Sequence, residues 1–229
     1  MIGTGYYSSY IIYVLPALLI SLAAQIAVKS SFSKYSKVYC AMTGAQAARR
    51  VLEINGVSGV RIERVSGQLT DHFDPRTNVI RLSESVYDAA SISAVGVAAH
   101  EAGHAVQYAK GYVPIKLRSA ILPVSQIGSQ LSMPLLLMGI VLSFELLINL
   151  GIIFFCAALL FQLVTLPVEF NASRRAMSAI ESGYLLTDER SVKGARSVLR
   201  AAAMTYVAAV IVSVMQLLRL LSLAGRRRR

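Results

Sequence analysis

The chain has 229 residues, of which 55% are hydrophobic and only 15% charged, with 23 Lys and Arg against 12 Asp and Glu and a net charge of +11. A soluble domain carries about 25% charged residues and a disordered chain is poor in apolar ones, so both classes are excluded. The two cysteines, Cys40 and Cys156, lie in a polar stretch and an apolar run, and do not indicate a disulfide framework.

The first predicted element is an uncharged apolar segment over residues 11–28. Its length is close to the roughly 20 residues that a membrane helix needs. No basic region precedes the segment, as it would in a cleaved signal peptide. We therefore expect residues 1–28 to form an N-terminal transmembrane anchor. The tyrosines that would form its interfacial belt are Tyr6, Tyr7, Tyr10 and Tyr13.

Two helices are predicted in the polar block of residues 29–119. Apolar residues at helical spacing predict the first helix over residues 41–55. Ser91 is a suitable N-cap for the second helix, over residues 92–110, and Gly111 would end it.

Short strands are predicted between these helices. Residues 60–65 largely alternate between apolar and polar side chains, which indicates a strand. Residues 68–71 and 79–82 are predicted as two further strands, joined by a turn-rich link over residues 72–78. The block is therefore expected to hold a small sheet with helices.

A second apolar region covers residues 120–166 and contains one formal charge, Glu145. The region is about twice as long as a single membrane span. Polar residues near its middle predict a hairpin of two spans, over residues 120–142 and 150–166.

The last apolar segment covers residues 201–223 and is interrupted by Arg219. It can be a fourth membrane span or an interfacial helix held at the membrane surface by its arginines. The four residues that end the chain are Arg226, Arg227, Arg228 and Arg229.

Basic residues are distributed unevenly between the segments. Residues 29–119 hold 12 Lys and Arg and residues 169–200 hold 6, whereas none precede residue 11 or lie in the hairpin loop. The positive-inside rule then places both polar blocks in the cytoplasm and the N-terminus outside, although a fourth crossing would leave the terminal arginines outside too. The excess of positive charge fits contacts with anionic lipid headgroups, and we expect no binding to nucleic acid.

The chemistry is indicated by the motif HEAGH at residues 100–104. Residues four apart on a helix project from one face, so the imidazoles of His100 and His104 can bind a single zinc ion. Glu101 is the only charged residue between Asp88 and Lys110. A buried carboxylate is costly without a cation, and beside a metal it can act as the general base of a metalloprotease.

Two histidines leave zinc one protein ligand short, and only one other histidine, His72, is present. The predicted hairpin crosses the membrane twice, so carboxylates beyond it return to the side of His100, whereas Glu145 would lie on the far side. Glu169 directly follows the third span and is the favoured third ligand. The carboxylates that stay open as alternatives are Glu181 and Glu189.

The chain resembles the YugP-type family of bacterial membrane zinc metallopeptidases, also called neutral zinc metallopeptidases. It resembles more distantly the gluzincin peptidases of the HtpX and CAAX-protease type. The segments that carry the resemblance are residues 71–76 (DHFDPR), 79–87, 98–107 (AAHEAGHAVQ), 167–176 (PVEFNASRRA) and 201–206 (AAAMTY).

The resemblance implies a fold and an activity. The fold is an α+β zincin-like, gluzincin catalytic domain combined with an α-helical transmembrane bundle. The activity is that of a peptidase of the bacterial plasma membrane with one zinc ion, acting on a peptide or protein substrate; the positive-inside rule places its site in the cytoplasm. The site residues implied are His100, His104 and Glu169 as zinc ligands and Glu101 as the base.

One position departs from the HtpX-like pattern, in which an acidic residue four positions after the ligand glutamate orients a histidine. Ser173 stands there in this chain, so the orienting role would pass to Asn171. The candidate donors to the developing oxyanion are Tyr206, Arg174 and His72, each with packing or lipid contact as the alternative role. Resemblance to zincins also suggests a strand that pairs with substrate, formed by Val79, Ile80, Arg81 and Leu82.

Two other functions are weighed against a peptidase. A catalytically inactive membrane scaffold or chaperone of the same fold would keep the spans and bind no metal. A metal transporter would need ionisable residues within several spans, and the hairpin has only Glu145. A homo-oligomer or a regulatory membrane partner stays open.

The expected organisation is an anchor (1–28), a catalytic part (29–119), a hairpin (120–166), a second catalytic part (167–200) and a C-terminal helix with a basic tail (201–229).

Overall fold

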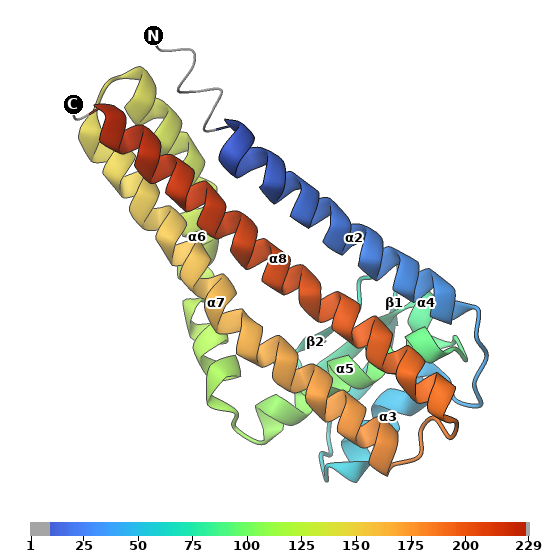
Figure 1. Cartoon of the computed structure of the whole chain (residues 1–229). Helices are drawn as coiled ribbons and strands as arrows, with labels where there is room; N and C mark the ends of the chain where they lie inside the picture. Colours follow the sequence, from blue (N-terminus) through green and yellow to red (C-terminus); the bar gives the residue numbers. More distant parts are fainter. Residues whose placement is uncertain (1–9, 228–229) are drawn as a thin grey trace. The chain divides into compact units, whose positions relative to one another are not determined.

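The computed structural model (Figure 1) describes residues 10–227, which fall into two compact units. We term the unit made of residues Ile26–Lys116 and Pro167–Met204 the sheet unit. The other, the bundle unit, comprises, within the described residues, 10–25, Leu117–Leu166 and 205–227. The predicted belt residues Tyr6 and Tyr7, and the terminal Arg228 and Arg229, lie outside the described residues.

The sheet unit contains a mixed sheet of three strands within the described part of the chain: β1 (Arg61–Val65), β2 (His72–Asp74) and β3 (Val79–Ser83). Their order is β1-β3-β2, with β3 parallel to β1 and antiparallel to β2.

The position of β2 corrects the predicted strand over residues 68–71. Leu69 has a φ of 57°, in the left-handed region, so the backbone cannot stay extended there. The strand begins instead at His72, inside the segment expected to be a turn-rich link. Asp71 secures this start, because its carboxylate accepts hydrogen bonds from the Ser83 N–H at 2.7 Å and from the Ser83 hydroxyl at 3.0 Å.

The strand β3 is central and has a neighbour on each side. This corrects the expectation that it is the edge to which a substrate peptide adds, since its backbone groups are already engaged by β1 and β2. The correction applies to all the residues predicted to form that edge: Val79, Ile80, Arg81 and Leu82.

The helix α3 (Gly44–Ile54) packs beside the sheet. It begins at a capping box in which the Thr43 side chain accepts from the Gln46 N–H and the Gln46 side chain accepts from the Thr43 N–H. Its apolar residues recur at helical spacing and are buried in the core that it shares with β3 and α5. The short helix α4 (Glu84–Tyr87) follows β3.

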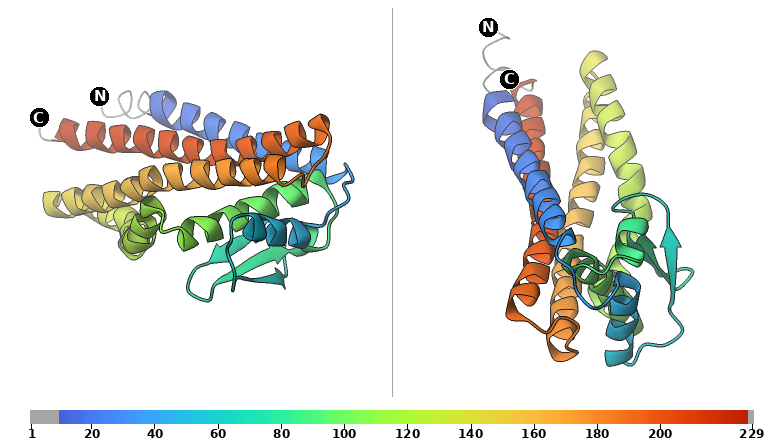
Figure 2. Two further views of the ribbon diagram at one scale, coloured as in Figure 1. Left: turned by 90° about the horizontal axis from the view of Figure 1, so that it is seen from below. Right: turned by 90° about the vertical axis from the view of Figure 1, so that its right-hand side faces the viewer.

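The helix α5 (Ile92–Ala109) lies at the centre of the sheet unit and matches the predicted helix closely. The Ser91 hydroxyl accepts from the Ala94 N–H at 3.3 Å, as expected for an N-cap, and Gly111 has a positive φ of 67° after the helix ends. Thirteen of the 18 residues of α5 are buried, because its alanines and glycines are small enough to let other elements approach it from several sides. In the left view of Figure 2, α5 (green) lies between the sheet (teal) and the segments of α7 and α8 that belong to this unit (orange).

Among the described residues, four helices are long and apolar enough to cross a membrane, as the sequence predicted. They are α2 (Leu15–Ser36), α6 (Val113–Val141), α7 (Glu145–Ser182) and α8 (Glu189–Arg227), and a π-helical turn over Tyr10–Val14 precedes α2. In the bundle unit α6 and α7 form the predicted hairpin (Figure 2). The helices are longer than the spans predicted, and α7 continues without a break beyond Leu166 to Ser182.

Candidate metal centre

Three predicted ligands meet where α5 contacts α7 in the sheet unit. The Nε2 atoms of His100 and His104 are 3.1 Å apart. One oxygen of Glu169, Oε2, lies 3.2 Å from the first of these nitrogens and 3.6 Å from the second. The planes of the two rings are nearly perpendicular, at 85°.

A close helix contact brings these side chains together. A Cβ atom on Gly103 would lie 2.7 Å from the carbonyl oxygen of Ala172, which is closer than real Cβ contacts come. The absence of a side chain at Gly103 therefore lets α5 and α7 approach at the level of the ligands. Residues 69 positions apart in the chain, such as His100 and Glu169, become neighbours as a result.

The distances test whether these residues fit a zinc ion. Ligand atoms bound tetrahedrally at about 2.0–2.1 Å lie about 3.3 Å from one another. The three separations of 3.1, 3.2 and 3.6 Å surround this value. Two imidazole nitrogens and one carboxylate oxygen are also a donor set typical of catalytic zinc sites. The residues present therefore fit one zinc ion.

Each histidine has a hydrogen-bond partner on its other ring nitrogen. Nδ1 of His104 lies 3.0 Å from Oε1 of Gln107, and Nδ1 of His100 lies 3.2 Å from the Ser173 hydroxyl. The Asn171 side chain does not contact either ring but accepts a hydrogen bond from Gln107. Ser173 thus occupies the position expected for a residue that orients His100. Asn171 is connected to His104 only through Gln107.

The site is shielded from solvent on one side only. Glu169 is 2% exposed and His104 is 7% exposed, whereas His100 and Glu101 are partly exposed. A buried carboxylate stays ionised at low cost only when cations or hydrogen-bond donors surround it. The partly exposed side is where water or a substrate can reach the cluster.

Glu101 contacts β2 through its carboxylate. The N–H of Phe73, in β2, donates a hydrogen bond to its carboxylate. Burial raises the pKa of Glu101, and the negative charges of Glu169 and Asp71 raise it further. The His100 ring and the Phe73 N–H lower it, without cancelling the rise.

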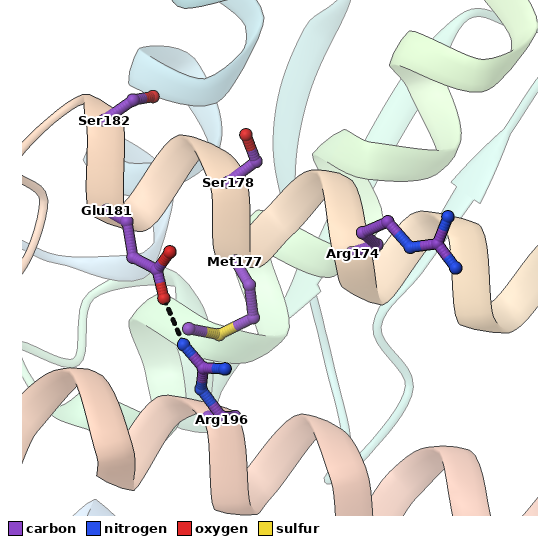
Figure 3. Close-up of a pocket in the computed structure, with 6 residues that line it drawn as sticks. All are labelled: Arg174, Met177, Ser178, Glu181, Ser182 and Arg196. Atoms are coloured by element: carbon purple, nitrogen blue, oxygen red, sulfur yellow. Dashed lines mark hydrogen bonds and ion pairs between the residues drawn. The ribbon is translucent and has the colours of Figure 1, made fainter.

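The remaining predicted residues lie elsewhere. The His72 ring is exposed, and its Nδ1 lies 2.8 Å from the Thr70 carbonyl oxygen, beside its own turn. Arg174 is exposed and lines a cavity of about 550 Å³, where Glu181 forms an ion pair with Arg196 (Figure 3). Tyr206 lies on α8 in the bundle unit. The roles of His72, Arg174 and Tyr206 as donors stay predictions.

Two residues near the site were not predicted from the sequence as functional. Gln107 is fully buried and contacts His104, and its position three residues later on the same helix is a signal that spacing could have revealed. Asp71 joins the start of β2 to the end of β3 beside Glu101. Nothing in its local sequence indicates that partner, because the contact depends on strand pairing.

Comparisons with known proteins agree with this chemistry. The family described as "Putative neutral zinc metallopeptidase" matches residues 10–225. The chain is 51% identical, over 213 residues, to a Bacillus subtilis (strain 168) protein named "Putative membrane protease YugP". The aligned region covers 92% of this chain and 94% of that relative. No solved structure matches the chain at a significant level.

Proposed function

The chain belongs to the neutral zinc metallopeptidase family, and from this premise we propose that it is a membrane-bound endopeptidase that depends on one zinc ion. The proposed ligands are His100, His104 and Glu169, and the proposed general base is Glu101. The arrangement proposed is that of a gluzincin, in which two ligands come from one helix and a glutamate from another.

One observation carries the proposal. Two imidazole nitrogens and a carboxylate oxygen from separate helices converge within 3.6 Å of one another, with a second glutamate next to the first histidine. Without a cation, Nε2 of His104 and Oε2 of Glu169 would compete for a single proton on Nε2 of His100, which lies 3.1 Å from the first and 3.2 Å from the second. A bound cation removes that conflict and also neutralises Glu169.

The roles of the chain's own residues follow from their positions. When bound, zinc supplies Lewis-acid polarisation of a substrate carbonyl and increases the acidity of a bound water. Glu101 accepts a proton from the attacking water and returns it to the leaving amine. The Phe73 N–H donates a hydrogen bond to the Glu101 carboxylate and holds it in place.

The substrate would bind in extended form along the outer edge of β2. Since β3 is central, the edges of the sheet are β1 and β2. Only β2 is connected to the proposed base, through the Phe73 N–H. A peptide strand added there would run past Glu101, so backbone pairing would supply affinity while the scissile bond is presented to the cluster.

The proposal includes an orientation in the membrane. Residues 29–119 and 167–200, which contain all the proposed site residues, carry 18 of the 23 Lys and Arg of the chain. The positive-inside rule therefore favours a cytoplasmic catalytic part in a multi-pass protein.

Thiol labelling of intact cells tests this orientation. The single-cysteine variants Gln68→Cys, in the catalytic part, and Ser143→Cys, in the hairpin loop, are made in a background that lacks the two native cysteines. A membrane-impermeant thiol reagent should label the Ser143→Cys variant and leave the Gln68→Cys variant unlabelled until the cells are opened. Labelling of Gln68→Cys in intact cells would place the catalytic part outside.

The decisive experiment replaces Glu101 by Gln, which keeps the shape of the side chain and removes its basicity. The Glu101→Gln variant should lose cleavage of a casein-type substrate by about 1,000-fold or more, because general-base catalysis is removed, and should still bind zinc. The exposed Glu53→Gln substitution on α3 is the matched control and should leave both properties unchanged.

The outcomes separate the candidate functions. Cleavage by Glu101→Gln at the original rate would exclude Glu101 as the base. If the unsubstituted protein binds no zinc and cleaves no peptide, it is instead the inactive scaffold. Metal analysis of the purified proteins, made beside each cleavage assay, distinguishes these results.

A further inference from the structure

A chain of hydrogen bonds links the proposed metal ligand His104 to α7. Gln107 is fully buried, and its Oε1 lies 3.0 Å from Nδ1 of His104. Its Nε2 donates to the carbonyl oxygen of Val168 at 2.7 Å and to Oδ1 of Asn171 at 3.0 Å. Oδ1 of Asn171 also accepts from Nε of Arg175, at 2.8 Å.

The chemistry of the partners forces a direction on every bond. The Arg175 guanidinium has only donors, so the atom of Asn171 that it contacts must be the amide oxygen. The Val168 carbonyl can only accept, so the Gln107 atom facing it must be the amide nitrogen. The Val168 carbonyl and the Arg175–Asn171 pair therefore orient the Gln107 amide in the same way, with its oxygen toward His104.

This orientation determines where His104 carries its proton. An amide oxygen can only accept, so Nδ1 of His104 must be the donor. In the neutral ring Nε2 then has no proton, and its lone pair faces Nε2 of His100 and Oε2 of Glu169.

We propose that Arg175, Asn171 and Gln107 form a positioning relay that holds His104 in the tautomer and ring orientation needed to bind the metal. The inference rests on the proposed function, since it assumes that Nε2 of His104 is a ligand. Gln107 and Asn171 act through the histidine and do not touch the reacting atoms. Partners of this kind commonly contribute about 10–100-fold to metal affinity, because they fix the ligand before the metal arrives.

The two histidines differ in how firmly they are held. Nδ1 of His100 faces the Ser173 hydroxyl, which can donate or accept and therefore does not impose a tautomer. Nδ1 of His104 faces the Gln107 amide oxygen, and the orientation of that amide is determined by its hydrogen bonds to Val168 and Asn171. The relay should therefore affect metal binding more than Ser173 does.

The test measures the zinc dissociation constant of the full chain in detergent, by competition with a chromogenic chelator. Gln107→Met, which keeps the length of the side chain and removes its hydrogen bonds, should weaken zinc binding about 10–100-fold. Asn171→Ala keeps the bond from Gln107 to Val168 and should weaken binding by a smaller factor, about 3–10-fold. It also serves as the test if Gln107→Met does not yield folded protein.

Two controls separate positioning from a general loss of stability. Gln126→Met, on an exposed part of α6, is the matched substitution and should leave zinc affinity unchanged. Visible absorption of the cobalt-substituted protein reports the ligand geometry, and its bands should shift in Gln107→Met but not in Gln126→Met. A merely structural role would lower the unfolding temperature of the metal-free protein without moving these bands.

The results distinguish the relay from the proposed function. If the original chain and Gln107→Met bind zinc equally tightly, with the same cobalt spectrum, the relay is wrong and the zinc site stands. If the original chain itself binds neither zinc nor cobalt, the proposed function fails.

Discussion

The sheet unit and the bundle unit differ in what their apolar side chains contact. In the sheet unit, α3, α5, β3 and parts of α7 and α8 share one continuous core, and buried polar groups such as Glu169 and Gln107 are paired. In the bundle unit the buried cluster is small and is centred on Leu136, Ile148 and Leu220. Leu137, on α6 in the same unit, is 62% exposed.

The difference fits a chain whose bundle unit packs in lipid and whose sheet unit packs in water. An extended surface of leucine and isoleucine side chains is stabilised by lipid, so a bundle unit in a membrane does not need an extensive core of its own. Polar groups can be buried only where the protein supplies their partners, and this occurs at the proposed metal centre. Zinc binding and peptide cleavage should therefore be sensitive to substitutions in the sheet unit and tolerant of apolar substitutions in the bundle unit.

The largest contrast is expected between two glutamates of α7. Glu169→Ala removes a proposed ligand and should reduce zinc affinity by roughly 100-fold or more and abolish cleavage, since zinc would keep two protein ligands. Glu145→Ala, at the start of the same helix in the bundle unit, should leave both unchanged. Zinc content after dialysis measures the difference, and equal content in both variants would contradict the assignment of Glu169.

A second contrast compares two leucines. Leu82 is fully buried in β3, so Leu82→Ala should cost about 2–5 kcal/mol of unfolding free energy through the lost contacts and the cavity. Leu137→Ala removes a side chain that faces outward and should cost about 0.5 kcal/mol or less. Unfolding in detergent, followed by circular dichroism, provides the comparison; similar losses would mean that Leu137 is covered by protein.

Removal of the metal should affect one unit more than the other. At a free zinc concentration about 100 times the dissociation constant, binding stabilises the native state by about 2.7 kcal/mol. Chelation should therefore lower the unfolding temperature while the helical signal of the bundle unit persists. An unfolding temperature that does not respond to chelator would show that the native protein holds no metal at the cluster.

A helix contact gives a smaller expected effect. Gly103→Ala places a methyl group 2.7 Å from the Ala172 carbonyl oxygen, which should cost about 1–3 kcal/mol and move Glu169 away from the histidines. Gly151→Ala meets side-chain and backbone atoms of α6 at 2.6–2.9 Å and should destabilise the hairpin without changing zinc affinity. Equal zinc affinities for the two variants would contradict the role of Gly103.

The smallest effect is expected at Asp74, which ends β2. Hydrogen bonds from the Thr77 hydroxyl, the Arg76 N–H and the Arg81 guanidinium hold the pKa of Asp74 below its ordinary value. A lowered pKa means that the carboxylate stabilises the fold above the unfolded value of about 3.9, and that this contribution is lost as the pH falls toward the folded value. In Asp74→Asn, the unfolding temperature should therefore depend less on pH below about 4 than it does in the unsubstituted protein.

Some features were predictable because their signals are local. Ser91, the apolar periodicity and Gly111 correctly placed α5 to within one residue at its C-terminal end. The spacing of His100 and His104 on that helix predicted that their rings would lie together, and their Nε2 atoms are 3.1 Å apart. Glu169 was favoured because a hairpin returns the chain to the same side of the membrane.

Other features depended on contacts between distant segments. The predicted strand over residues 68–71 failed because Leu69 takes a left-handed conformation that apolar alternation does not reveal. The role expected for Val79 in binding substrate failed because strand order is decided by pairing partners. The link from Gln107 to Asn171 needed the approach of α5 to α7.

The sequence by itself determined the four membrane-length helices and the pair of histidines one turn apart, because hydrophobic length and helical period act over neighbouring residues. Only the tertiary structure decided that β3 is the central strand, that β2 meets Glu101, and that buried amides face His104. Strand order and the direction of a buried hydrogen bond depend on which groups the fold brings within about 3 Å, and no local pattern encodes that choice.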